Sequence, residues 1–163
     1  MPLGGRTLPP VGYIEFCQRS PAECGPAKSP EAEYRPTPFQ WSHIQRLNAE
    51  VNGAFTRASD DTVYGKDEMW AYPDKAGDTE DFALVKKKRL KEYGVPYAAL
   101  LLTVALKRNG DGHALLTIVT DKGDFVLDDE SDEIRIWHEA PYQLLKRQSP
   151  STPLNWVRVN DPD

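Results

Sequence analysis

Apolar residues stand three or four positions apart between residues 37 and 55: Trp41, Ile44, Leu47, Val51 and Phe55. This spacing predicts one helix with a single apolar face turned toward a core. Thr37 is a suitable N-cap, Pro38 suits the first helical position, and Gln40 completes a capping box.

A second helix is predicted to begin near Asp78, which is a good N-cap. Its apolar positions are Phe82, Leu84, Val85 and Leu90, and Gly94 followed by Pro96 ends it. A basic cluster, Lys86 to Arg89 with Lys91, falls late in this helix. Because cations suit a helix C-terminus, we interpret the cluster as a solvated helix end.

The pattern then changes to short apolar runs separated by turn residues. Runs at 98–106, 113–120 and 124–128 predict three strands of an antiparallel meander. The segment 134–159 predicts a further strand pair. Helices first and strands afterwards indicate the α+β class.

The remaining stretches are poor in periodic structure. Residues 1–36 hold seven of the fourteen prolines and are predicted to form an extended, irregular arm, followed by a single domain over 37–163. Residues 56–77 form a long connection, and long loops are often functional. Trp70 lies in this connection, where it either walls a cleft or packs in the core.

Length and charge narrow the function classes. A chain of 163 residues suits one domain. The net charge of −5 argues against a nucleic-acid partner, because phosphate binding needs clustered cations. The sequence contains no run of 18 apolar residues, so no membrane span is predicted. Met1 to Pro10 lack the apolar stretch of a signal peptide.

Cys17 and Cys24 are the only cysteines. Two cysteines cannot complete a zinc site, and the three histidines show no ligand spacing. A short disulfide loop is the preferred interpretation, and two free thiols are the alternative. A disulfide predicts a protein that works outside the cytoplasm, in the periplasm or as a secreted protein.

Three residues have the types and positions of a catalytic triad. Thr79 stands at a helix start, where N–H groups and the helix dipole favour an anion. His113 opens one predicted strand and Asp128 closes the next. By spacing alone a structural role is the commoner explanation. A two-residue loop at Asp121-Lys122 would place Asp128 on the face of His113, whereas a three-residue loop would separate them.

Several motifs, in order along nearly the whole chain, resemble the bacterial transglutaminase-like cysteine peptidases, a family that includes the LapG-type periplasmic proteases. Gly77 to Lys86 read GDTEDFALVK and resemble the family signature GDCED[YF]ALxK. Gly112 to Thr117 (GHALLT) resemble its histidine motif GHAVLT, and Asp124 to Asp129 (DFVLDD) resemble its strand ending in LDN. Further similarity covers the Phe16-Cys17 to Cys24 segment, Tyr64 to Trp70 and Pro141 to Ser149.

The resemblance implies a papain-like or transglutaminase-like core, in which the nucleophile's helix packs on an antiparallel sheet. It makes His113 the general base and Asp128 the residue that orients it. It also implies calcium, through acidic residues flanking the nucleophile, here Asp78 and Glu80; simple helix capping by both is the equal alternative. No organic cofactor is implied. The implied partner is a protein or peptide substrate such as a surface adhesin.

The chain departs from the family at the nucleophile, because Thr79 stands where the family has cysteine. An internal alcohol stays protonated and depends on a base for activation, and threonine is restricted at χ1. Three accounts follow: a natural loss that leaves a peptide-binding homologue, an engineered substitution, or slow hydrolysis by a His113–Thr79 pair. A calcium-dependent structural domain is a further alternative. A second departure is Asp129, where the family commonly has asparagine.

Overall fold

The computed structural model describes residues 1–26, 33–66 and 68–161. The helices are α1 (Val11–Arg19), α2 (Pro38–Ala54), α3 (Asp60–Tyr64) and α4 (Thr79–Tyr93), with 3-10 turns η1 (Pro21–Cys24), η2 (Tyr97–Ala99) and η3 (Trp137–Glu139). The strands are β1 (Leu3–Thr7), β2 (Thr56–Arg57), β3 (Ala76–Gly77), β4 (Leu100–Leu106), β5 (Gly112–Thr120), β6 (Gly123–Leu127), β7 (Arg135–Ile136), β8 (Gln143–Gln148) and β9 (Trp156–Val159). None of the helices in these ranges is long and apolar enough to cross a membrane.

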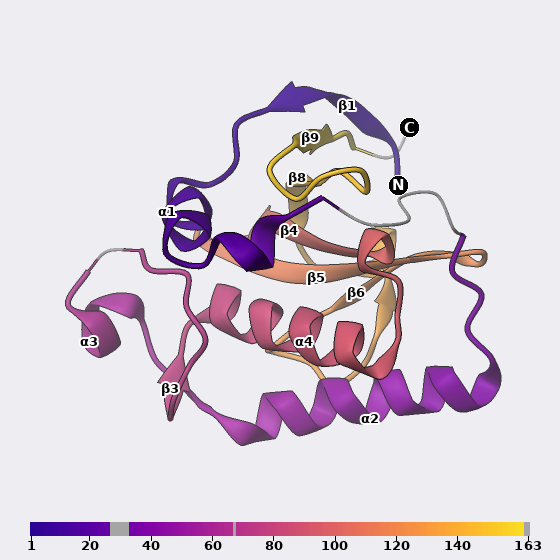
Figure 1. Ribbon diagram of the computed structural model, residues 1–163, viewed down its shortest axis with the longest axis horizontal. Helices are drawn as coiled ribbons and strands as arrows, with labels where there is room; N and C mark the ends of the chain where they lie inside the picture. Colours follow the sequence, from indigo (N-terminus) through magenta and orange to yellow (C-terminus); the bar gives the residue numbers. More distant parts are fainter. Residues whose placement is uncertain (27–32, 67, 162–163) are drawn as a thin grey trace.

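Within the described ranges, seven strands form one antiparallel sheet in the order β1-β9-β8-β4-β5-β6-β7. Helix α4 lies against strands β4 and β5, and α2 packs on α4, farther from the sheet (Figure 1). Strands β2 and β3 form a separate short parallel pair before α4. The predicted α+β class, with one helix packed on an antiparallel sheet, is confirmed.

The predicted meander is β4-β5-β6, and β8 with β9 is the predicted later strand pair. The register pairs Thr120 with Gly123 and Leu116 with Leu127. The hairpin therefore has the two-residue loop Asp121-Lys122, which is the alternative that brings Asp128 to the face of His113.

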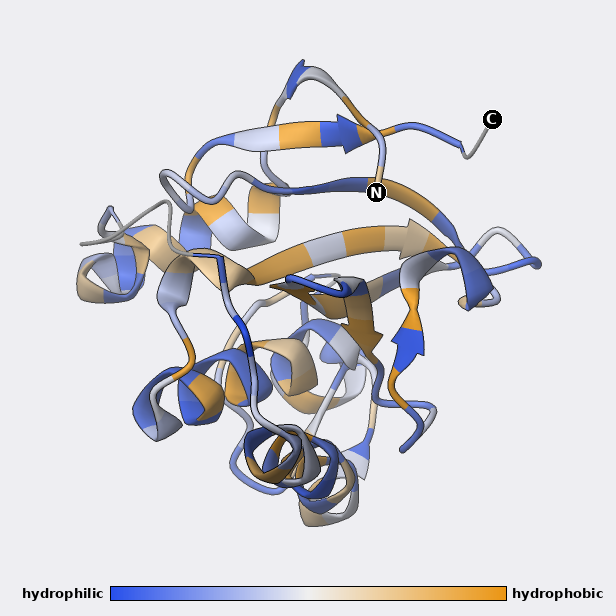
Figure 2. Cartoon of the chain, turned by 90° about the vertical axis from the view of Figure 1, so that its right-hand side faces the viewer, coloured by the Kyte–Doolittle hydropathy of each residue, from blue (hydrophilic) through white to orange (hydrophobic). Residues whose placement is uncertain are grey.

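The main core fills the space between the sheet and helices α2 and α4. It buries side chains from both helices and from the strands, including Ile44, Val51, Phe82, Leu90, Leu100 and Leu116. A second, smaller hydrophobic cluster is formed by buried residues of strands β4, β5, β6, β8 and β9: Ala105, Leu115, Val126, Leu144 and Val159. Figure 2 shows orange, hydrophobic residues along the central strands and mixed colours on the helices.

Both long helices begin as the sequence predicts. Thr37 and Gln40 form a capping box at α2, and Asp78 with Asp81 forms another at α4. Gly77 precedes the second box and has no room for a side chain, because a Cβ there would lie 2.8 Å from Asp81 Oδ2. The glycine allows the chain to pass close to α4 immediately before Thr79.

The prediction of an extended, irregular arm over residues 1–36 is wrong for its described part, which contains β1, α1 and η1. Its prolines do not interrupt these elements: Pro10 caps α1 and Pro21 is the first residue of η1, where a missing N–H costs nothing. Tyr13 and Phe16, three positions apart, join the main core. Residues 27–32 of the arm lie outside the described ranges, and the domain boundary at residue 36 stays a prediction.

The interpretation of the basic cluster as a solvated helix end is also wrong for two of its members. Lys86 is 1% exposed and Lys87 is 7% exposed. Helix α4 is covered by the sheet on one side and α2 on another, so little of its surface is left for solvent. Lys86 Nζ donates to the Asp128 carbonyl at 2.8 Å, and Lys87 Nζ donates to Gln148 Oε1 at 2.6 Å.

Candidate active site

Thr79 and His113 are brought into contact by α4 and β5. Thr79 is the first residue of α4, and His113 lies near the start of the adjacent strand. The distance from Thr79 Oγ1 to His113 Nδ1 is 3.1 Å, and the imidazole is 3% exposed. A hydroxyl at a helix N-terminus therefore faces a nitrogen of a buried ring.

Asp128 lies on the other side of the imidazole, with its Oδ1 2.8 Å from His113 Nε2. Burial opposes ionisation of Asp128, but hydrogen bonds from His113, from the Tyr142 hydroxyl and from the Glu130 N–H outweigh it and lower the pKa. An ionised Asp128 accepts the Nε2 proton, which leaves the Nδ1 lone pair facing Thr79. This is the arrangement of a general base with its orienting carboxylate.

The backbone and ring around this dyad are also fixed. The Asp128 carbonyl accepts from Lys86 Nζ and, at 3.0 Å, from Asn52 Nδ2 of α2. Tyr142 donates to Asp128 Oδ2 at 2.6 Å and its ring centroid lies 4.5 Å from that of His113. These residues hold both members of the dyad, and the sequence reasoning assigned none of them to the site.

Asp129 provides a second carboxylate at the site. Its Oδ1 accepts from Thr79 Oγ1 at 2.7 Å, and its Oδ2 accepts from Arg57 Nε at 3.0 Å. Thr79, His113 and Asp129 line a cleft of about 250 Å³, together with Arg57 and Gly77. Of the three residues proposed for the triad, Thr79 and His113 line this open cleft, and Asp128 contacts His113 from outside its lining. Their catalytic roles stay a prediction.

An acidic cluster lies beside the nucleophile position. Ligand oxygens of Asp60, Asp78 and Glu80 lie within 4.8 Å of one another. Burial and the neighbouring carboxylates raise the pKa of Glu80 to about 9, and burial raises that of Asp78. Asp60 is 2% exposed, and one of its oxygens accepts from the Met69 N–H, whereas the other has no hydrogen-bond partner among the residues that the structure describes.

This set of oxygens fits a hard cation. Three clustered carboxylates, one with an unpartnered buried oxygen, are stabilised when a divalent ion joins them, and calcium prefers such ligands. The family resemblance implied Asp78 and Glu80 but not Asp60, which comes from α3 some twenty positions earlier. A second group with three potential ligands, His113, Asp128 and Asp129, is already engaged in the bonds described above.

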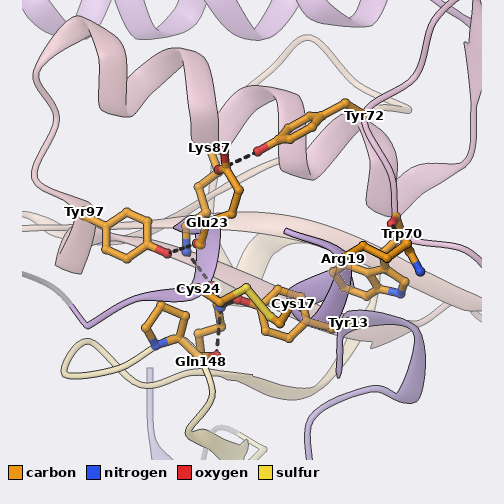
Figure 3. Close-up of a disulfide and its surroundings, with 11 residues drawn as sticks. Tyr13, Cys17, Arg19, Glu23, Cys24, Trp70, Tyr72, Lys87, Tyr97 and Gln148 are labelled. Atoms are coloured by element: carbon orange, nitrogen blue, oxygen red, sulfur yellow. Dashed lines mark hydrogen bonds between the residues drawn. A yellow bond between two sulfur atoms is a disulfide. The ribbon is translucent and has the colours of Figure 1, made fainter. Parts of the chain in front are cut away.

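The N-terminal segment supports the connection that leads into the site (Figure 3). Cys17 and Cys24 form a disulfide, with an S–S distance of 2.12 Å. Between these cysteines, Arg19 Nη2 donates to the Trp70 carbonyl at 2.7 Å and Glu23 Oε2 accepts from the Tyr72 hydroxyl at 2.9 Å. The disulfide-bonded segment therefore contacts the connection at Trp70 and at Tyr72, which is seven positions before Thr79.

Trp70 itself is 2% exposed and packs edge-on against Tyr13, with ring centroids 5.5 Å apart. Of the two alternatives for this residue, core packing is the one observed. It does not line the cleft beside Thr79.

A family model for the bacterial transglutaminase-like cysteine proteinases, BTLCP, matches residues 3–163. The chain belongs to this family. No curated protein sequence matches it. Solved structures with the same fold include LapG of Legionella pneumophila in calcium-bound form, with a TM-score of 0.60 and 21% identity over 79% of this chain and 75% of that one. The EGTA-treated form of LapG matches with a TM-score of 0.58 and 22% identity, over 71% of this chain and 64% of that one. This chain therefore spans less than two thirds of the EGTA-treated structure.

The family is one of cysteine peptidases, which act on proteins, and the transglutaminase-like fold is shared. The resemblance assigned the triad to a helix start, a strand and a strand end. Thr79 lies at the start of α4, His113 lies in β5, and Asp128 directly follows β6. The identities to LapG are low, so that similarity supports the fold alone.

Proposed function

We propose that this chain is an exported homologue of the family's peptidases, whose cleft beside Thr79 has the arrangement for peptide-bond hydrolysis by a Cys-His-Asp triad. In this proposal the chain is inactive or impaired in hydrolysis, because Thr79 occupies the nucleophile position. The observation that carries the proposal is the continuous contact from Thr79 to His113, at 3.1 Å, and from His113 to Asp128, at 2.8 Å.

With a thiol at position 79, this geometry supplies the steps of a cysteine peptidase. The thiol proton passes to His113 Nδ1, and the sulfur bonds to the scissile carbonyl carbon. His113 then gives the proton to the leaving amine as the C–N bond breaks. Water, deprotonated by His113, splits the resulting thioester and restores the thiol. Asp128 orients the imidazole and stabilises its charge throughout.

Threonine lacks the main advantage of the thiol in this scheme. A thiol titrates near pH 8.5 and lower still at a helix start, whereas an alcohol keeps its proton. Thr79 Oγ1 also lies 2.8 Å from the Ala114 carbonyl and 2.7 Å from Asp129 Oδ1, so acceptors other than His113 compete for its proton. These contacts favour a second candidate function, a module that holds a peptide or adhesin segment without cutting it.

Calcium at Asp60, Asp78 and Glu80 is part of the proposal. Its support is the clustering of the three carboxylates and the unpartnered buried oxygen of Asp60. A bound calcium supplies positive charge and fixes ligand positions. Asp78 caps α4 through its own contact with the Thr79 N–H at 2.8 Å, so its placement sets the position of residue 79.

An envelope location, periplasmic or secreted, is proposed from the Cys17–Cys24 disulfide, because such bonds persist in oxidising compartments. The proposed partner is a protein substrate, of which a bacterial surface adhesin is one class.

The test compares the chain with its Thr79→Cys variant on a library of peptides rich in small residues, with calcium present. The proposal expects cleavage by the variant at least 100-fold faster than by the native chain. Capture of an intact peptide by the native chain, with no cleavage by Thr79→Cys, would support the binding module instead. Neither cleavage nor capture of any library member would contradict both.

A further inference from the structure

The Thr79 hydroxyl has one proton and three acceptors within reach. Asp129 Oδ1 lies at 2.7 Å, the Ala114 carbonyl at 2.8 Å and His113 Nδ1 at 3.1 Å. Of these acceptors only Asp129 is a carboxylate, and hydrogen bonds to ionised acceptors are roughly twice as strong as neutral ones. The proton therefore goes preferentially to Asp129.

Asp129 is held where it can keep that proton. It is 5% exposed, and its second oxygen accepts from Arg57 Nε at 3.0 Å. The Arg57 guanidinium in turn lies over the Phe82 ring, 5.2 Å from the centroid. The preceding residue, Asp128, is fixed through its carbonyl by Lys86 and Asn52. Both carboxylate oxygens therefore have partners, and the backbone immediately before Asp129 is held by two hydrogen bonds.

The two consecutive carboxylates thus have different hydrogen-bond partners, and the 3.8 Å between Asp129 Oδ1 and His113 Nε2 is too long for a hydrogen bond. Asp128 bonds to His113 and Tyr142, whereas Asp129 bonds to Thr79 and Arg57. An acceptor-only group beside position 79 competes with His113 for the proton that a nucleophile must give to its base. An amide at position 129 would instead have N–H groups to donate.

We propose that Asp129, anchored by Arg57, is a positioning residue that binds the Thr79 hydroxyl proton and keeps it from His113. The non-hydrolytic state then results from Thr79 and Asp129 together, so full activity requires a change at both positions. The statement about hydrolysis rests on the proposed function, whereas the statement about the hydrogen bond does not.

Double-mutant cycles in urea unfolding, run without a peptide, test the hydrogen bond. Thr79→Val removes the hydroxyl at nearly constant shape, and it is combined with Asp129→Ala in one cycle and with His113→Ala in another. Contacting partners show interaction energies that distant residues do not. We expect a coupling of about 10-fold in the unfolding equilibrium constant with Asp129 and less than about 2-fold with His113. Equal couplings, or a larger one with His113, would overturn the proposal.

Should Asp129→Ala fail to fold, Asp129→Asn takes its place in the unfolding cycle. Hydrolysis is tested separately, in the Thr79→Cys background. Adding Asp129→Asn is expected to raise kcat about 10-fold or more with KM within about 2-fold, because the change acts on the reacting group and not on peptide binding. The control is Glu133→Gln, which removes an exposed charge five positions from Asp128 and is expected to leave kcat unchanged. An unchanged kcat with Asp129→Asn would overturn the proposal. Failure of every variant to cleave would contradict the proposed function, and the unfolding cycles would still decide the role of Asp129.

Discussion

The buried amine of Lys87 predicts an unusual dependence of stability on pH. Desolvation and, to a smaller extent, the nearby Lys91 lower its pKa to about 7, while Glu23 opposes the shift. In the unfolded chain the same amine titrates near 10.4. Between these values the unfolded chain binds more protons than the folded chain. The free energy of unfolding must therefore rise with pH across this window.

The size of the effect follows from the shift. One pKa unit corresponds to about 1.4 kcal/mol, so between pH 7 and pH 9 the contribution of Lys87 changes by about 2 kcal/mol in favour of the folded state. The neutral amine still donates to Gln148 Oε1, at 2.6 Å, so its hydrogen bond survives the titration. Lys87→Met keeps the length of the side chain and removes the titration.

The assay is urea unfolding of the native chain and Lys87→Met at several values between pH 7 and pH 9. The difference between their unfolding free energies should change by about 2 kcal/mol, in favour of the native chain as pH rises. Lys88→Met is the matched control, because Lys88 is the exposed neighbour on the same helix. A constant difference between native chain and Lys87→Met across this range would refute the reasoning.

Three further predictions concern the surroundings of the site. Calcium at 100 times its Kd should raise the unfolding free energy by about 2.7 kcal/mol. Asp60→Asn should abolish this gain, as measured by calorimetric titration and thermal melts. The control variant Asp61→Asn, at an exposed position, should retain it. Gly77→Ala should destabilise the fold by about 1 to 3 kcal/mol in urea unfolding, because its Cβ would lie 2.8 Å from an Asp81 oxygen; a neutral result would show that the helix start yields easily. Replacing Cys17 and Cys24 by alanine should cost about 2 to 3 kcal/mol by loop-closure entropy, and a loss below about 0.5 kcal/mol would argue that the disulfide contributes little.

Local signals in the sequence predict much of this fold. The capping box at Thr37 and the N-cap at Asp78 set both long helices, and the turn residues near 109–112 and 121–123 set the meander. Such features depend on neighbours in the chain, so they can be read from one sequence. The register of the β5–β6 hairpin remained open, because both loop lengths suit the same residues.

Features that depend on distant contacts were missed. Lys86 and Lys87 look like solvent-exposed cations until the sheet and α2 are placed on either side of their helix. Asp60 belongs to the acidic cluster only because α3 returns to the start of α4. Arg57 and Tyr142 likewise act on the candidate site through partners more than ten positions away. Motif similarity located Thr79, His113 and Asp128, but not the residues that hold them.

In the proposed function the site keeps a working base and orienting carboxylate, His113 and Asp128, and the native chain lacks the thiol. The most direct measurement is the intact mass of Thr79→Cys after reaction with a small-residue peptide chloromethyl ketone. Because Cys17 and Cys24 are disulfide-bonded, the thiol introduced at position 79 would be the only one available, and the native chain is the control for alkylation of His113. We expect rapid formation of one adduct, slowed at least about 10-fold when His113→Gln is added, and none on the native chain. An adduct that forms at the same rate without His113 would contradict this expectation.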